Sequence, residues 1–194
     1  MHGLIFSELK KYVETKFDAK TWDTLLEKAG LKGNLYLAAS VYPDNDLLSL
    51  VTTACKATGL TANAILEDFG DFIAPDLIKQ YGFLVKPDWT LVDFLCNTEE
   101  TIHKIVRFHP GVTPPQLIVR RVDDDRVTIS YDSKRKMCAL LKGIVKGSAR
   151  HYNKTVSIVE SRCMLRGDTE CTVHVQVEAA VNHKLASHAA APRS

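Results

Sequence analysis

The chain has 194 residues, of which 45% are hydrophobic and 25% charged, and its formal net charge is +2. These values are typical of a globular protein of one ordinary domain, and the charge argues neither for nor against nucleic acid. No apolar run approaches the roughly 18–20 residues of a membrane helix, and the first residues lack the pattern of a signal peptide. We therefore expect a cytoplasmic protein without membrane contact, whose five cysteines are thiols or metal ligands rather than disulfides.

The first hundred residues carry the hydrophobic spacing of helices. Asp44 or Asp46 can cap the third helix. The fourth helix starts at Thr61 and is expected to end near Gly70, before a short apolar stretch leads past Pro75. The expected helices cover residues 4–17, 22–29, about 44–58, 61–70 and 90–108, the last with a break near residue 97.

The pattern changes at the sequence GVTPP, whose prolines cannot continue a helix. The following residues predict a β-hairpin over 116–131, an amphipathic helix over 133–152, and two further strands over 155–163 and 171–178. A helical half followed by the order β-β-α-β-β predicts an α+β fold with a four-stranded antiparallel sheet. We expect one domain over residues 1–178 and a disordered tail over 179–194.

The sequence SYDSKRKMC lies where the expected hairpin meets the next helix. Tyr131 and Ser133 share a strand face, Ser133 can cap the helix, and Arg135 follows in its first turn. A phenol, a hydroxyl, a guanidinium and a helix N-terminus together suit a carboxylate or phosphate ligand. The alternative is that Ser133 only caps the helix, Tyr131 packs and Arg135 is solvated.

Residues 133–159 contain seven Lys or Arg and no Asp or Glu. A basic stripe of this kind can contact nucleic acid, but it is more often a solvated helix face. No aromatic interleaving or known DNA-reading motif accompanies it, so we expect no nucleic-acid partner.

His103 is the histidine whose position best suits a metal ligand. It lies on the margin of an apolar helix face, where its helical neighbours are Val106, Leu95 and Glu99. A histidine in such a place is usually a satisfied core or boundary residue, so the pattern alone leaves both interpretations open. His109 precedes a proline at the helix end, where a capping or solvated role is the expected one.

The order of several motifs resembles the H-NOX family, the heme-nitric oxide/oxygen binding domain. The motifs are MHGLIF at the start, YPD at 42–44, IH at 102–103, TPP at 113–115, YDSKRKM at 131–137 and LLKGIVKGSARHY at 140–152. The resemblance covers about residues 1–178 and points to the bacterial stand-alone type, which is related to the heme domain of soluble guanylate cyclase. It implies that heme b lies between the helical half and the sheet-containing half.

The resemblance assigns roles to particular residues. His103 matches the proximal iron ligand of the family, and an imidazole is a standard heme ligand. The residues that match the motif Y-x-S-x-R, which holds the heme propionates, are Tyr131, Ser133 and Arg135. Pro115 matches a proline that presses on the porphyrin. The segment from His103 to TPP is one residue shorter than the family leads us to expect, and His109 is the next candidate for the ligand.

The resemblance also bears on which gas is bound. Oxygen-binding members donate a hydrogen bond from a distal tyrosine, and Leu140 stands at that position here. The neighbouring pocket positions on the fourth helix are Phe72, Ile73 and Ala74, which offer no donor either. We therefore expect a five-coordinate ferrous heme that binds NO and CO and excludes O2.

The same family likeness implies a sensor rather than an enzyme. Binding of NO weakens the iron–histidine bond in the family, and release of His103 would be the signal. Stand-alone bacterial members usually regulate a histidine kinase or a cyclic-di-GMP enzyme, so we expect a separate partner protein of this kind. The residues show no nucleophile–base constellation that would indicate catalysis.

Three of the cysteines are expected to lie close together. Cys163 and Cys171 stand at the inner ends of the last two strands, which a hairpin brings together, and Cys138 lies near the start of the preceding helix. They can be buried thiols without a further role. Some H-NOX proteins hold zinc near this place with three cysteines and a histidine, and these three cysteines match. Glu160 stands at the histidine position, and His151 is a substitute for the fourth ligand. The alternative function is therefore a heme-independent thiol or zinc redox sensor on the same fold.

Overall fold

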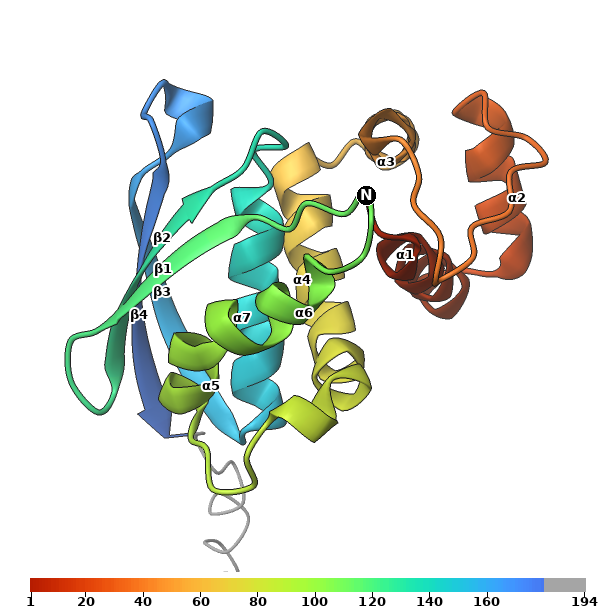
Figure 1. Cartoon of the computed structure of the whole chain (residues 1–194). Helices are drawn as coiled ribbons and strands as arrows, with labels where there is room; N and C mark the ends of the chain where they lie inside the picture. The colour runs from red at the N-terminus through yellow and green to blue at the C-terminus, as the bar shows by residue number, and fades with distance from the viewer. Residues whose placement is uncertain (180–194) are drawn as a thin grey trace, which may run out of the picture.

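The sequence folds into a group of helices on one side and a twisted sheet on the other, with two long helices between them (Figure 1). The computed structural model describes residues 1–179, and the tail expected over 179–194 lies almost wholly outside them. Within the described residues, no helix has both the length and the apolar character that crossing a membrane requires.

The helical half contains four α-helices: α1 (Gly3–Lys16), α2 (Ala19–Lys28), α3 (Asp44–Thr58) and α4 (Ala62–Gln80). Polar side chains start three of them, because His2, Asp18 and Thr61 each accept a hydrogen bond from a backbone N–H of the first turn. α3 begins directly after Pro43, with Asp44 as its first residue rather than its cap. Leucine, phenylalanine and tryptophan side chains from these helices form one apolar core.

The fourth helix is longer than the sequence predicts, because it passes Gly70 and Pro75 and ends only at Gln80. Proline at 75 leaves the carbonyl of Asp71, four residues earlier, without its helical donor. The guanidinium of Arg150 donates to that carbonyl at 2.8 Å, so another helix supplies the missing hydrogen bond. The prediction of a helix end near Gly70 is therefore wrong, because tertiary contacts stabilise the whole length of α4.

Gly70 does not end α4 but allows α7 (Cys138–His151) to pack closely against it. A Cβ atom added at Gly70 would lie 2.4 Å from the carbonyl oxygen of Leu140 in α7. In the same way, a Cβ atom at Gly143 would lie 2.0 Å from the oxygen of Glu67. The two helices thus meet backbone to backbone, which only glycine permits.

Residues 91–106 contain the predicted helical region and its predicted break. α5 (Leu91–Asn97) starts with a capping box between Thr90 and Asp93 and ends at Asn97. A π-helical turn, η2 (Glu99–His103), and the short α6 (Lys104–Val106) follow. π-helical turns are rare and frequently occur at functional sites, and His103 closes this one.

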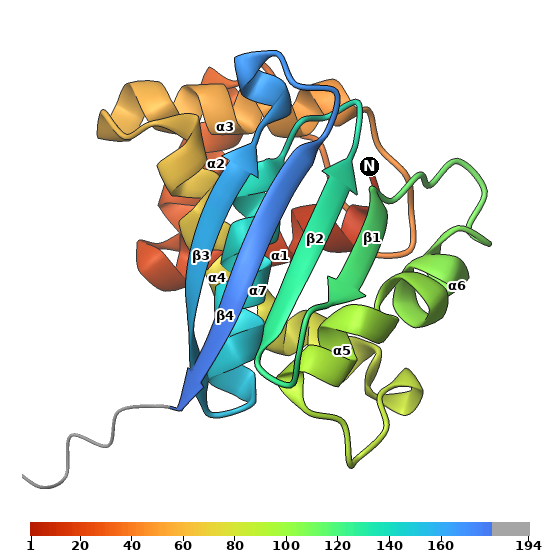
Figure 2. The ribbon, with the colours of Figure 1, turned by 90° about the vertical axis from the view of Figure 1, so that its left-hand side faces the viewer.

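The second half contains the predicted four-stranded antiparallel sheet, in the order β1-β2-β4-β3. Its strands are β1 (Gln116–Arg121), β2 (Arg126–Asp132), β3 (Lys154–Arg162) and β4 (Cys171–Ala179). Alternate residues of β2 and β4, such as Val127, Ile129 and Val173, are buried under α7 and α5. The other face, turned to the viewer in Figure 2, carries no helix among the described residues. The predicted α+β class is confirmed.

The basic side chains of α7 pair with carboxylates rather than standing free in solvent. Lys146 lies 2.5 Å from Glu67, and Arg150 lies 2.6 Å from Asp71, both on α4. The positive face of α7 therefore serves packing against α4.

Candidate functional site

A cavity lies between the helical half and the sheet, and its wall is mostly apolar. The centres of water-sized molecules can occupy about 220 Å³ of it, against the roughly 10–15 Å³ that one water needs. The space therefore suits a large apolar ligand. The predicted site residues that line it are His103, Pro115, Tyr131, Ser133, Arg135 and Leu140.

His103 reaches the cavity from the last residue of η2. Its Nδ1 lies 2.8 Å from the Oε2 atom of Glu99, the first residue of the same turn. Burial lowers the pKa of His103 below its ordinary value, although the hydrogen bond with Glu99 acts in the opposite direction. The lowered pKa favours the neutral imidazole, and because Nδ1 faces Glu99, Nε2 is the ring nitrogen left for a metal ion.

The stretch Tyr131–Met137 differs from its prediction in one respect. α7 begins at Cys138, so Ser133 does not cap the helix and Arg135 does not lie in its first turn. Residues 133–136 form a turn instead, with Lys136 in a left-handed conformation at φ +52°. The reason is that β2 continues to Asp132 and the chain must then reverse before the helix starts.

Tyr131 at the end of β2 and Ser133 and Arg135 in this turn still line the cavity together. The Tyr131 hydroxyl accepts the backbone N–H of Met137 at 3.2 Å, and burial raises the pKa of the phenol. The Ser133 hydroxyl accepts the backbone N–H of Arg135 at 3.3 Å. A hydroxyl that accepts a hydrogen bond can still donate its own proton, so both groups can serve as donors to a ligand.

Arg135 is held by groups from both halves. Its Nη1 donates to the carbonyl of Thr113 at 2.6 Å, and its Nε lies 2.8 Å from Oδ2 of Asp44. Asp44 also pairs with the amino group of Met1 at 2.8 Å. Burial raises the pKa of the Asp44 carboxyl, but its hydrogen bonds with the Met1 amino group and Arg135 outweigh this and lower it overall. Asp44 is a site residue that sequence reasoning missed, although it stands in the YPD motif.

On the side of α4 and α7, the cavity wall contains Leu140 and Ala74. Ile73, predicted to line the pocket, packs instead in the core of the helical half, and Phe72 packs beside it against Tyr12. Ser148 was not predicted: its buried hydroxyl lines the cavity and has no hydrogen-bond partner among residues 1–179.

The helix α1 supplies part of the wall that sequence reasoning also missed. Leu4 and Ile5 line the cavity from its first turn. The motif MHGLIF was the available signal, because these apolar residues come directly after the helix start.

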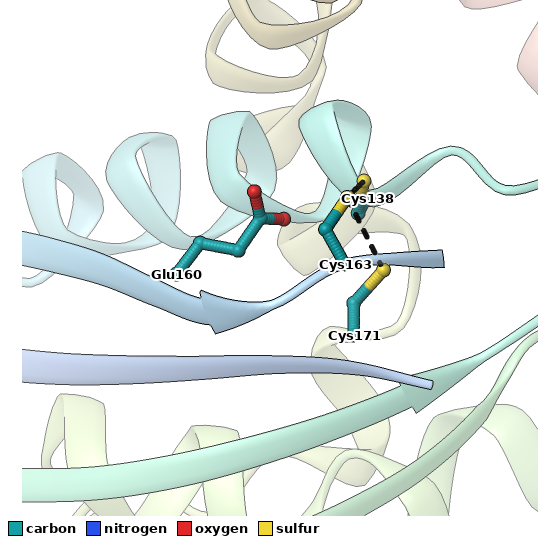
Figure 3. A group of neighbouring side chains, drawn as sticks. All are labelled: Cys138, Glu160, Cys163 and Cys171. Atoms are coloured by element: carbon teal, nitrogen blue, oxygen red, sulfur yellow. Dashed lines mark hydrogen bonds between the residues drawn. The ribbon is translucent and has the colours of Figure 1, made fainter. Parts of the chain in front are cut away.

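The three cysteines form a second cluster, at the end of the sheet nearest the start of α7 (Figure 3). The Sγ atom of Cys163 lies 3.6 Å from that of Cys138 and 3.9 Å from that of Cys171. A carboxylate oxygen of Glu160 joins them, and the four ligand atoms all lie within 4.8 Å of one another. Burial and the neighbouring thiols raise the pKa of the Cys138 thiol.

Glu160 reaches the cluster from a β-bulge in β3. Its Oε2 pairs with Arg166 at 3.2 Å and with Lys142 at 3.7 Å. Its Oε1 is buried and finds no hydrogen-bond partner in the described part of the chain. His151, the other candidate for this position, is the last residue of α7 whereas Cys138 is the first, so it lies far from the thiols.

A family model described as Haem-NO-binding matches residues 2–160 of this chain. The chain therefore belongs to the Haem-NO-binding, or H-NOX, family, whose members bind heme. A comparison with the sequences of curated proteins found no match.

Several solved structures share the fold. An H-NOX protein from S. oneidensis in the Fe(II)NO ligation state is 22% identical, with a TM-score of 0.85 over 92% of this chain and 99% of that one. The H-NOX domain from Shewanella oneidensis in the Fe(II)CO state is also 22% identical, with a TM-score of 0.81 over 92% and 99%. The Fe(II) unliganded H-NOX protein from K. algicida is 20% identical, with a TM-score of 0.80 over 94% and 99%.

Proposed function

We propose that this chain is a cytoplasmic, heme-based nitric oxide sensor. In this proposal heme b lies in the cavity, His103 binds the iron, and the ferrous heme binds NO and CO but not O2. The observation that carries it is that one apolar cavity brings together the imidazole of His103 and the donors of Tyr131, Ser133 and Arg135. Heme matches this arrangement, because it is a largely apolar ring that carries an iron ion and two carboxylates.

The residues present fit heme in three respects. The wall is apolar, as a porphyrin requires, and Nε2 of His103, the ring nitrogen not held by Glu99, can bind iron. The hydroxyls of Tyr131 and Ser133 and the guanidinium of Arg135 are groups that can donate to the propionates. The carbonyl of Pro115 also lies within reach of the Arg107 guanidinium at 3.5 Å, which fixes this proline at the wall.

The expected preference for NO and CO over O2 follows from the side chains near Leu140. Bound O2 is stabilised by a buried hydrogen-bond donor, which NO and CO need much less. Leu140 and Ala74 offer none. Ser148 carries a hydroxyl, but it stands eight residues along α7 from Leu140, about 12 Å on a helix.

The test of heme binding is the pair of variants His103→Ala and His109→Ala. We expect wild type and His109→Ala to purify with heme, and His103→Ala to lose it or to regain it only with added imidazole. His109 is a suitable control because its ring packs on His2, with the centroids 5.2 Å apart. If His109→Ala loses heme and His103→Ala retains it, the iron ligand is His109 and not His103.

We propose that the output passes to another protein, in line with a sensor that performs no chemistry on a substrate. Release of His103 on NO binding would free η2 and α6 to move, and a histidine kinase or a cyclic-di-GMP enzyme is the expected partner. We also propose that residues 1–178 form one domain that holds the heme.

A zinc site at Cys138, Cys163, Cys171 and Glu160 is our second proposal, favoured by the geometry of the cluster. Tetrahedral zinc with Zn–S bonds of about 2.3 Å separates two sulfur ligands by about 3.8 Å. The two measured Sγ–Sγ distances, 3.6 and 3.9 Å, are close to this value. The buried, unpaired Oε1 of Glu160 can complete the set. Bound zinc would fix the β3–β4 connection to the start of α7.

Metal analysis of the purified protein tests this site. We expect about one zinc per chain in wild type, less in Cys171→Ser and in Glu160→Gln, and an unchanged content in Glu178→Gln, whose side chain is exposed on β4. Wild-type protein that contains no zinc and in which Cys138, Cys163 and Cys171 titrate as thiols would contradict the proposal. A colourless protein that binds zinc but not heme would favour the alternative, a heme-independent thiol or zinc redox sensor.

A further inference from the structure

The imidazole of His103 is paired with a carboxylate on the side away from the cavity. The Nδ1 and Oε2 atoms of His103 and Glu99 lie 2.8 Å apart, and each side chain is only 17% exposed. In a site with little water, a hydrogen bond from an imidazole N–H to a carboxylate is strong and directional.

Contacts from three parts of the chain fix the carboxylate of Glu99. Its Oε2 also accepts the backbone N–H of Leu117 in β1 at 3.3 Å, and its Oε1 pairs with the guanidinium of Arg107, just after α6. Glu99 itself begins the π-helical turn that His103 ends. The carboxylate therefore cannot swing away without breaking contacts to η2, β1 and the end of α6.

We propose that Glu99 is a positioning residue that sets how strongly His103 holds the heme iron. The proposal rests on the proposed function, in which His103 binds that iron. A carboxylate that accepts the Nδ1 proton fixes the tautomer and ring orientation of a histidine and raises the basicity of Nε2. Glu99 thus makes His103 a stronger donor to iron than an imidazole bonded to a neutral acceptor.

Arg107 opposes this effect. Its guanidinium withdraws charge from the Oε1 atom of Glu99, so the carboxylate is a weaker acceptor for His103 than it would be alone. Removal of Glu99 and removal of Arg107 should therefore change the iron–histidine bond in opposite directions. A residue with a merely structural role would not produce this change of sign.

The consequence for sensing concerns the release of His103. A stronger bond between Nε2 and iron would slow the dissociation of His103 when NO binds. Glu99 and Arg107 together would set the NO response. Glu99 strengthens the bond between His103 and iron that must break, and Arg107 reduces this strengthening.

The experiment compares Glu99→Gln, Arg107→Gln and the control Glu100→Gln in heme-loaded, ferrous protein. Gln keeps the shape of Glu but removes the charge, and Glu100 is an exposed glutamate next along the chain. The readouts are the iron–histidine stretching frequency by resonance Raman, the heme reduction potential and the rate of His103 dissociation after NO is added. Far-UV circular dichroism checks that each variant is folded.

We expect Glu99→Gln to lower the stretching frequency, raise the reduction potential and speed His103 dissociation. Arg107→Gln should shift all three in the opposite direction, and Glu100→Gln should leave them unchanged. If Glu99→Gln does not fold, the shift in Arg107→Gln alone decides the question.

The failure of this inference is distinct from failure of the proposed function. A wild-type protein without an iron–histidine band, or with a band that survives in His103→Ala, would contradict the proposed ligand. A band that depends on His103 but has the same frequency in Glu99→Gln and Arg107→Gln as in wild type would overturn the role of Glu99.

Discussion

Arg135 links the cavity wall to the helical half through a single side chain. Its guanidinium is held by Thr113 and Asp44, and only 15% of the side chain is exposed. A guanidinium so placed is oriented before any ligand binds, so a carboxylate at the cavity loses little entropy in pairing with it. Asp44 is the residue that keeps this orientation.

Asp44→Asn should therefore weaken both the fold and the binding of heme. We expect a loss of about 1 kcal/mol in the free energy of unfolding of the heme-free protein, allowing for the partial exposure of Asp44. The pKa of Asp44 is lowered in the folded state, so its contribution is present above the unfolded pKa of about 3.9 and is lost as the pH falls through the folded pKa.

Urea unfolding of wild type and Asp44→Asn at pH 7 and at successively lower pH measures this. The difference between the two proteins should be constant near neutral pH and shrink only below about pH 4. A difference that disappears already at pH 6 would show that another group is responsible.

The site residues that could be predicted from the sequence are those that belong to short local motifs. His103, Pro115 and the Tyr131–Arg135 stretch could be placed from their spacing and from the family resemblance, and the structure brings them to one cavity. The spacing also makes Glu99 a helical neighbour of His103, but the contact between its carboxylate and Leu117 in β1 could not be predicted, because only the fold brings these elements together.

At the scale of elements, the packing of α7 on α4 decides where the cavity lies. Glycines at 70, 143 and 147 let the backbones of the two helices touch, and Arg150 repairs the break that Pro75 makes in α4. The wrong prediction of the C-terminal end of α4 has the same origin. Glycine and proline usually end helices, but here α7 packs against Gly70, and its Arg150 supplies the hydrogen bond that Pro75 removes. The same packing sets the phase of α4, so that Ala74 rather than Ile73 faces the cavity.

Gly143→Ala tests the contact between these helices. The added methyl group would meet the carbonyl oxygen of Glu67 at 2.0 Å, and backbone cannot move aside as a flexible side chain can. We expect a loss of about 1–3 kcal/mol in the free energy of unfolding, and a weaker binding of heme as α4 shifts.

The matched control is Gly82→Ala, where nothing lies within 4 Å of the added Cβ atom. Its urea midpoint should stay near that of wild type or rise slightly, because alanine reduces the entropy of the unfolded chain. Equal midpoints for the two variants would argue against close backbone contact between α4 and α7.

At the scale of the whole molecule, the two halves meet around the cavity. Besides Asp44 and Arg135, the ring of His2 contacts the ring of His109 in the loop after α6, and His2 forms a β-bridge with Val41. A movement of α6 would therefore reach α1 and the loop before α3 directly. These contacts would transmit a movement that follows the proposed release of His103 to the helical half.

Composition, periodicity and turn residues were sufficient to predict the α+β class, the four strands and the break at Asn97, because each depends on local sequence. The contacts between the halves were beyond such reasoning. They join residues far apart in the sequence, such as Asp44 and Arg135, and no local pattern specifies which partner a surface charge will meet.

The absorption spectrum of the purified ferrous protein, recorded first in air and then with NO, tests whether this chain is a heme-based NO sensor that excludes O2. We predict a histidine-bound heme spectrum that shows no stable O2 complex and that changes when NO is added. A stable spectrum of bound O2 in air, or a protein that takes up no heme at all, would contradict it.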